Sequence, residues 1–221
     1  MKRLNLKNVT MLAGIVAGLA LASPASATLL GNPVNFPLLS FDNGGTANYD
    51  ATADLFSVNA NPIALRLGPG APPRFVTGNP PEAGEFFTIN ISVDDSGNLI
   101  GGTAGDDLAV FGFADLDGDG TNDVSGLLLT GEVTGFGSQE NGATDLYDFS
   151  FSVTGGALAG AFGGSVGVSM QSERSTFTGS FADNFRGGAK GTLGVIPEPT
   201  TMLLLGSGVV GLAFAGRRRA A

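Results

Sequence analysis

The 221-residue chain contains no cysteine, no histidine and no tryptophan. Without Cys and His it cannot form a Ser-His-Asp or Cys-His triad, a His or thiolate zinc site, haem or iron–sulfur ligation, or disulfides. Basic residues are also scarce, since 11 Lys and Arg stand against 20 Asp and Glu. This acidic balance argues against nucleic-acid binding, because a protein must neutralise phosphates with Lys and Arg.

The N-terminus has the three parts of a secretory signal peptide. A basic segment is followed by an uncharged apolar stretch over residues 9–22, and then by the small residues Ala25, Ser26 and Ala27. The basic residues are Lys2, Arg3 and Lys7. The order of these parts predicts a signal peptide over 1–27, with Ala25 and Ala27 marking the cleavage site. The alternative is a buried N-terminal helix.

The C-terminus combines an extended tripeptide, an apolar run and a basic end. Pro197-Glu198-Pro199 disfavours helix, because proline fixes φ and removes a backbone donor. The next 17 residues, 200–216, carry no charge. As a helix they span roughly 25 Å, the short limit for a hydrocarbon core of about 30 Å. Arg217, Arg218 and Arg219 follow and would stop translocation at the cytoplasmic side of the inner membrane.

These C-terminal features resemble the PEP-CTERM sorting signal of Gram-negative bacteria. The resemblance rests on Val195-Ile196-Pro197-Glu198-Pro199, the apolar run and the three arginines, about 25 residues in all. It implies that Pro197, Glu198 and Pro199 are read by an exosortase, a membrane-embedded cysteine transpeptidase that removes the tail. It also implies a destination outside the inner membrane, often in a host that makes extracellular polysaccharide. The alternative is a single-pass anchor that is never cleaved.

Between the two ends lies a predicted ectodomain, residues 28–196. It holds 5 of the basic and 19 of the acidic residues, a net charge of −14, and 30 of the 36 glycines. Such a surface repels anionic polymers and favours divalent cations. Because interior glycine costs a helix about 1 kcal/mol relative to alanine, long helices are excluded and tight turns are favoured.

The periodicity of the ectodomain predicts short strands. Phe87, Ile89, Ile91 and Val93 alternate on one face of 86–93, and 94–98 has the composition of a hairpin turn. The other expected strands are 108–113, 124–133, 147–153, 166–170, 176–181 and 189–193. Short strands with glycine turns predict an all-β fold, an antiparallel sandwich or jelly roll. The proline-rich stretch Asn61–Gly84 predicts a long loop or an edge insertion.

One acidic segment has the spacing of a calcium loop. Asp115, Asp117, Asp119 and Asp123 occupy positions 1, 3, 5 and 9, with Gly120 at position 6. Calcium takes six to eight hard oxygens, and Thr121 would add its backbone carbonyl at position 7. The pattern is similar to the DxDxDG loops of EF-hands, dockerins and thrombospondin type 3 repeats, but Gly126 stands where EF-hands place a bidentate Glu. The alternative is an acidic turn in which Asp and Gly serve only as turn formers.

Two other acidic pairs, Asp94-Asp95 and Asp106-Asp107, are expected to be turn or solvated residues. Paired carboxylates are the catalytic groups of many glycosidases, so a glycoside-acting enzyme is a third alternative. Because some pair among 19 acidic residues lies close together by chance, such a pair is weak support for it.

The leading prediction is a non-catalytic surface or extracellular-matrix protein. It would be exported by the Sec machinery, cut by signal peptidase, held transiently in the inner membrane and processed by exosortase. The second prediction is a secreted module that binds carbohydrate, such as extracellular polysaccharide, or another surface.

Overall fold

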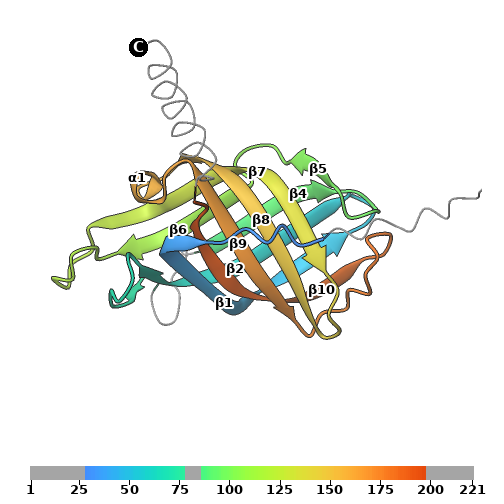
Figure 1. The fold of residues 1–221 in the computed structure, drawn as a ribbon, viewed down its shortest axis with the longest axis horizontal. Coiled ribbons are helices and arrows are strands. Elements are labelled where there is room, and N and C mark those ends of the chain that lie inside the picture. Colours follow the sequence, from blue (N-terminus) through green and yellow to red (C-terminus); the bar gives the residue numbers. More distant parts are fainter. Residues whose placement is uncertain (1–27, 78–85, 198–221) are drawn as a thin grey trace, which may run out of the picture.

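The computed structural model describes residues 28–77 and 86–197, which form ten strands and one four-residue helix. The strands are β1 (Asn35–Asp50), β2 (Leu55–Arg66), β3 (Arg74–Phe75), β4 (Phe86–Val93), β5 (Leu99–Gly102), β6 (Leu108–Ala114), β7 (Val124–Gln139), β8 (Thr144–Gly155), β9 (Ser165–Glu173) and β10 (Phe185–Val195). The helix α1 (Ala159–Phe162) lies between β8 and β9. Every strand pairing is antiparallel (Figure 1).

The sheet closes on itself. Its order is β3-β2-β1-β10-β9-β8-β7-β6-β4-β5, and β2 also pairs with β4. Phe56 lies opposite Ile91 and Val58 opposite Ile89 in that pairing. Eight strands therefore form a ring, while β3 and β5 extend it at β2 and β4. Closure leaves the eight strands without a free edge for most of their length.

The space inside the closed sheet is filled with aromatic side chains. An interior enclosed by eight strands is just wide enough for side chains to fill it. Phe56 lies among Phe136, Tyr147, Phe149 and Phe185, with ring centroids 5.0–5.9 Å apart. Such tilted ring pairs add to the free energy gained from burying their area. These aromatic side chains therefore pack strands from opposite sides of the closed sheet against one another.

Glycines in the strands allow neighbouring parts of the chain to approach closely. A Cβ at Gly191 in β10 would overlap the Ser169 carbonyl oxygen and approach the Phe41 ring. A Cβ at Gly112 in β6 would overlap the Val76 carbonyl oxygen, which accepts a hydrogen bond from the Phe113 N–H at 3.1 Å. The glycine-rich composition thus serves close packing of strands as well as turns.

The prediction of an antiparallel all-β fold is confirmed. The prediction of a sandwich or jelly roll is wrong, because the β2–β4 pairing joins the strands into one closed sheet instead of two packed sheets. Alternation of buried residues cannot distinguish these two cases, since both have one inner face.

Five of the seven predicted strands extend further in the structure, and 86–93 coincides with β4. The predicted strand 176–181 is wrong, because this segment lies in the β9–β10 connection. Phe177 and Phe181 are nevertheless buried and pack on each other with ring centroids 5.0 Å apart.

The prediction of a long loop or an edge insertion over Asn61–Gly84 is wrong for its first residues, which belong to β2, whereas β3 lies at one end of the strand order as an edge insertion would. Residues 78–84 of this range lie outside the described residues. β2 continues through Pro62 to Arg66, and β3 follows at Arg74–Phe75. Pro62 lies opposite Phe41 next to a register shift, where a missing N–H is tolerated. Phe75 is 72% exposed.

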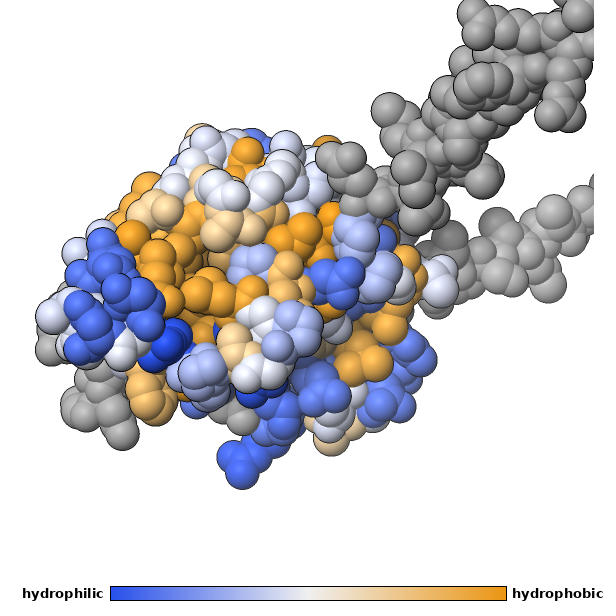
Figure 2. Space-filling view, turned by 60° about the vertical axis from the view of Figure 1, so that its left-hand side comes forward, coloured by the Kyte–Doolittle hydropathy of each residue, from blue (hydrophilic) through white to orange (hydrophobic). Residues whose placement is uncertain are grey.

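Figure 2 shows hydrophobic side chains gathered between hydrophilic ones on the face of the molecule that it views.

Candidate functional site

The acidic segment forms the loop between β6 and β7. The loop projects from one end of the closed sheet and is drawn in yellow-green at the left of Figure 1. Its base is closed by the Asp123 N–H, which donates to the Ala114 carbonyl oxygen at 2.9 Å. The two long flanking strands therefore fix where the loop starts and ends.

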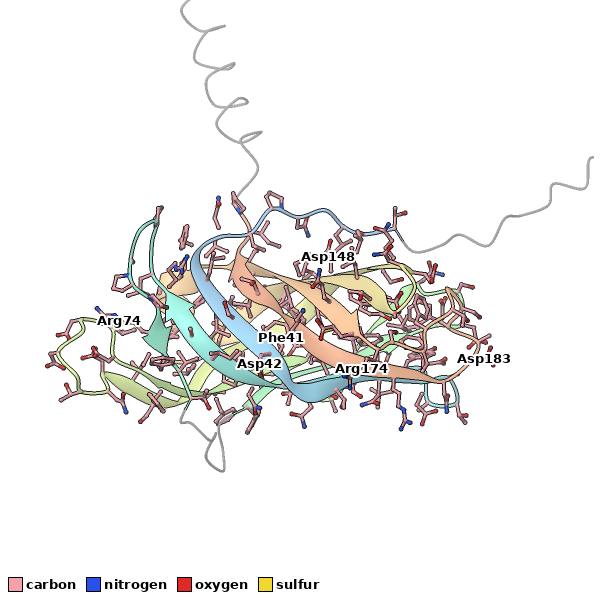
Figure 3. All side chains as sticks on the ribbon, turned by 90° about the horizontal axis from the view of Figure 1, so that it is seen from below. Phe41, Asp42, Arg74, Asp148, Arg174 and Asp183 are labelled. Atoms are coloured by element: carbon pink, nitrogen blue, oxygen red, sulfur yellow. The ribbon has the colours of Figure 1, made fainter. Side chains whose placement is uncertain are left out.

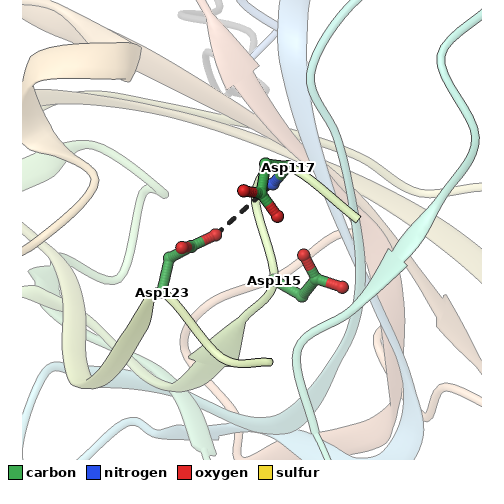
Figure 4. Close-up of side chains that lie close together, drawn as sticks. All are labelled: Asp115, Asp117 and Asp123. Carbon is green, nitrogen blue, oxygen red and sulfur yellow. Dashed lines mark hydrogen bonds between the residues drawn. The ribbon is translucent and has the colours of Figure 1, made fainter. Parts of the chain in front are cut away.

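Three of the predicted ligand residues lie together. Asp115, Asp117 and Asp123 each offer a carboxylate oxygen, and these oxygens lie within 4.8 Å of one another (Figure 4). Asp115 is half-buried and the other two are exposed. Carboxylate oxygens are the ligands that calcium prefers, so this arrangement supplies three of the six to eight that it takes.

The same carboxylates accept hydrogen bonds from the backbone of the loop. Asp115 accepts from the N–H groups of Gly118 and Gly120, and Asp123 accepts from those of Leu116 and Asp117. These bonds are typical of Asp residues that stabilise turns. Both readings of the sequence, calcium ligands and turn formers, are thus compatible with this geometry.

Asp119 does not belong to this group of three carboxylates. The Asp119 carboxylate accepts hydrogen bonds from the Thr121 N–H at 2.7 Å and from the Thr121 hydroxyl. The hydroxyl and amide bonds from Thr121 hold the pKa of Asp119 below its usual value. Asp119 and Thr121 therefore stabilise the turn of the loop.

A cation that the sequence did not predict lies beside the loop. Arg74 of β3 donates a hydrogen bond to the Asp117 carbonyl oxygen at 3.4 Å, and its guanidinium occupies the space that a Cβ on Gly118 would need. Desolvation acts to raise the pKa of Asp115. The amide hydrogen bonds from Gly118 and Gly120 and the charge of Arg74 outweigh it, so this pKa lies below its usual value. Arg74 therefore neutralises part of the charge that a metal ion would otherwise meet.

Two carboxylates are buried that the sequence did not single out as core residues. Asp107, expected to be a turn or solvated residue, is 1% exposed and accepts hydrogen bonds from the N–H groups of Thr103 at 2.7 Å and Val133 at 2.8 Å. Asp145 is fully buried and accepts from the Asn141 N–H at 2.7 Å. Each of the two carboxylates thus accepts a hydrogen bond from a backbone N–H four residues away in the sequence, and Asp107 also binds the N–H of Val133 in β7. Asp94, by contrast, forms the predicted turn, accepting from the N–H groups of Ser96 and Asn98.

The closed sheet ends where the C-terminal motif begins. Val195, the last residue of β10, lies opposite Val166 in β9 and Asn35 in β1. The Ile196 N–H still donates to the Ser165 carbonyl oxygen at 3.1 Å. Pro197 has no N–H to continue this ladder. The motif therefore starts inside the last strand and leaves the sheet at its first proline.

Comparison with known protein families decides the nature of this end. A family model described as the PEP-CTERM protein-sorting motif matches residues 195–219. The chain carries a PEP-CTERM sorting motif. The resemblance proposed from the sequence is thereby confirmed for this C-terminal segment. Neither the curated proteins nor the solved structures contain a match to the chain.

Several predicted features lie outside the described residues. They are the signal peptide over 1–27 with its cleavage residues Ala25 and Ala27, the motif residues Glu198 and Pro199, the apolar segment 200–216, and Arg217, Arg218 and Arg219. Within residues 28–77 and 86–197, no helix is both long enough and apolar enough to cross a membrane.

Proposed function

We propose that this chain is a non-catalytic, exported surface or extracellular-matrix protein that an exosortase releases from a transient anchor in the inner membrane. The observation that carries the proposal is the PEP-CTERM motif over 195–219, which indicates export and processing towards the cell surface. The basic, apolar and small-residue segments of 1–27 agree with it, because they would deliver the chain to the Sec machinery and signal peptidase.

The geometry around β10 supports processing of the folded protein. The strand is paired on both sides up to Val195, and the last ladder hydrogen bond is made by Ile196. A transpeptidase that reads Pro197, Glu198 and Pro199 would act beyond this bond. Removal of the tail would then leave the closed sheet intact, with all of its strands.

The chemistry of the chain supports a non-catalytic role. The nucleophile and base pairs that use Cys or His are excluded by composition. Asp107 and Asp145 are buried with backbone N–H partners, which suits a structural role better than contact with a substrate. A binding module for carbohydrate or another surface is the alternative role, and a glycoside-acting enzyme is the more distant one.

The β6–β7 loop favours a second property, a structural calcium ion. The grouping of oxygens from Asp115, Asp117 and Asp123 within 4.8 Å supports this proposal. Calcium would offset the repulsion among these carboxylates and tie the loop together in a chain that has no disulfides. The remaining ligands would be backbone carbonyls or water.

The experiment that tests the sorting proposal replaces Pro197, Glu198 and Pro199 together with alanine. The expected result is accumulation of precursor that keeps its C-terminal tail in the membrane fraction of cells that contain exosortase, because the recognition element is gone. Alanine at Thr200 and Thr201 is the matched control and should leave release unchanged. Normal release of the triple variant would contradict the proposal.

A further inference from the structure

A cavity of about 510 Å³ lies on the outside of the closed sheet, where β1 and β10 pair beside the end of β9. Its lining residues are Thr46, Glu173, Arg174, Arg186, Gly187 and Gly188. A second cavity of about 340 Å³ adjoins it and shares Arg186. The second cavity adds the polar residues Asn48, Thr176 and Asn184. Figure 3 shows Arg174 on this part of the molecule, away from the end that holds Arg74.

The cavity concentrates positive charge in an acidic protein. Residues 28–196 contain five basic residues, and two of them, Arg174 and Arg186, line this cavity. The acid in the lining, Glu173, forms an ion pair with Lys190. Both arginines are exposed. Their side chains are therefore accessible to solvent, and the carboxylate in the cavity lining, Glu173, has a cationic partner in Lys190.

The backbone holds both arginines in place. The Arg186 N–H donates to the Thr176 hydroxyl at 3.1 Å, and the Arg186 carbonyl accepts from the Thr176 N–H at 2.9 Å. Arg174 has φ of 52°, in the left-handed region that favours glycine or asparagine. A long cationic side chain at such a position costs the backbone free energy, which points to a use for the side chain itself.

We propose that this cavity binds a sugar acid, with the carboxylate held by Arg174 and Arg186. The planar guanidinium offers parallel N–H donors that match a carboxylate bidentately. The Thr46 hydroxyl and the Asn48 and Asn184 amides line the two cavities and are groups of the kind that bind the hydroxyls of a sugar ring. The Asn48 amide also donates to the Thr46 hydroxyl, and Asn184 Oδ1 accepts from the Ala51 N–H. The volume lies within the range of about 300–1,000 Å³ that is typical of small-molecule sites.

The overall charge of the protein limits the length of acidic sugar chain that the cavity can bind. A net charge of −14 repels a long polyanion, but at physiological ionic strength this repulsion is screened beyond about 8 Å. A short acidic oligosaccharide, or the end residue of a longer one, therefore suits the cavity better than the middle of a polyanion. The proposal goes beyond export and sorting, and it does not depend on the C-terminal motif.

The test is calorimetric titration of the full chain in detergent micelles with digalacturonate. Binding is expected for the native protein and for Arg66→Gln, whose arginine is exposed but lies outside both cavities. Arg174→Gln and Arg186→Gln should each weaken binding at least about tenfold, because a charge-assisted hydrogen-bond pair is lost. Arg186→Lys should recover only part of the affinity, because lysine keeps the charge but not the bidentate geometry.

Neutral cellobiose and inorganic phosphate complete the experiment. Neither should bind as tightly as digalacturonate if both the carboxylate and the hydroxyls are recognised. Digalacturonate affinity that is unchanged in Arg174→Gln and Arg186→Gln, or absent in the native protein, would overturn the proposal. Phosphate binding as tight as that of digalacturonate would overturn the assignment to a sugar acid. Because both arginines are exposed, the melting temperatures of the variants should match that of the native protein and so report intact folding.

Discussion

Asp107 offers the sharpest test of how the closed sheet is stabilised. Its carboxylate is 1% exposed and accepts hydrogen bonds from the N–H groups of Thr103 and Val133. Substitution Asp107→Ala leaves both donors without an acceptor. Hydrogen bonds to a charged group contribute about 1.5–3 kcal/mol each, so loss of the two bonds should lower the free energy of unfolding by about 3–6 kcal/mol. For a domain of this size the melting temperature should fall by roughly 10 °C.

The neighbouring residue is a matched control. Asp106 is exposed and accepts a hydrogen bond from the Thr154 hydroxyl at 2.6 Å. Asp106→Ala also removes a carboxylate from this turn, but water can replace it as the partner of the Thr154 hydroxyl. The free energy of unfolding should therefore fall by less than about 1 kcal/mol. Urea unfolding followed by circular dichroism measures both variants. Equal losses for Asp107→Ala and Asp106→Ala would refute the reasoning that burial of the acceptor matters.

Two further predictions concern the loop and the tyrosines. Calcium should raise the melting temperature of the native protein and of Asp119→Ala, but not of Asp117→Ala, because only Asp117 belongs to the group of three carboxylates. Identical melting curves in calcium and in chelator would contradict the site. Desolvation, followed by the charges of nearby carboxylates, raises the pKa of Tyr49 from 10.0 to about 12, and burial and the charge of Asp145 raise that of Tyr147 further. The neutral phenols therefore contribute stability in full below pH 10, and this contribution is lost as the pH rises towards 12. Tyrosinate absorbance should thus rise together with unfolding, and an earlier, separate rise near pH 10 would contradict the burial of both rings.

Regular alternation predicted β4 but did not find every strand, since β2 also alternates between buried and less buried residues from Leu55 to Pro62 and was not predicted. Phe87, Ile89, Ile91 and Val93 identify β4 because each second residue is large and apolar, and all four are fully buried. β1 was missed because glycine, asparagine and register shifts interrupt its pattern. Strands of this kind are hard to predict in a glycine-rich chain, because glycine allows close approach of neighbouring strands but adds no large apolar residue to the alternating pattern.

The remaining differences arise from contacts between residues distant in sequence. Phe177 and Phe181 have the spacing of a strand face, but they pack into the aromatic cluster from a loop. Closure depends on β2 meeting β4, a pairing that no local pattern encodes. In the candidate site, spacing correctly brought Asp115, Asp117 and Asp123 together. It could not place Arg74, which comes from a strand about 40 residues earlier in the chain.

Intact-mass measurement of the protein recovered from the cell surface or the medium tests the central claim most directly. Cleavage near Pro197, Glu198 and Pro199 predicts a mass that lacks both the leader and the C-terminal segment with Arg217, Arg218 and Arg219. In cells without exosortase the tail should remain and the protein should stay with the membrane. A surface-exposed protein whose mass still includes the three arginines would contradict the account.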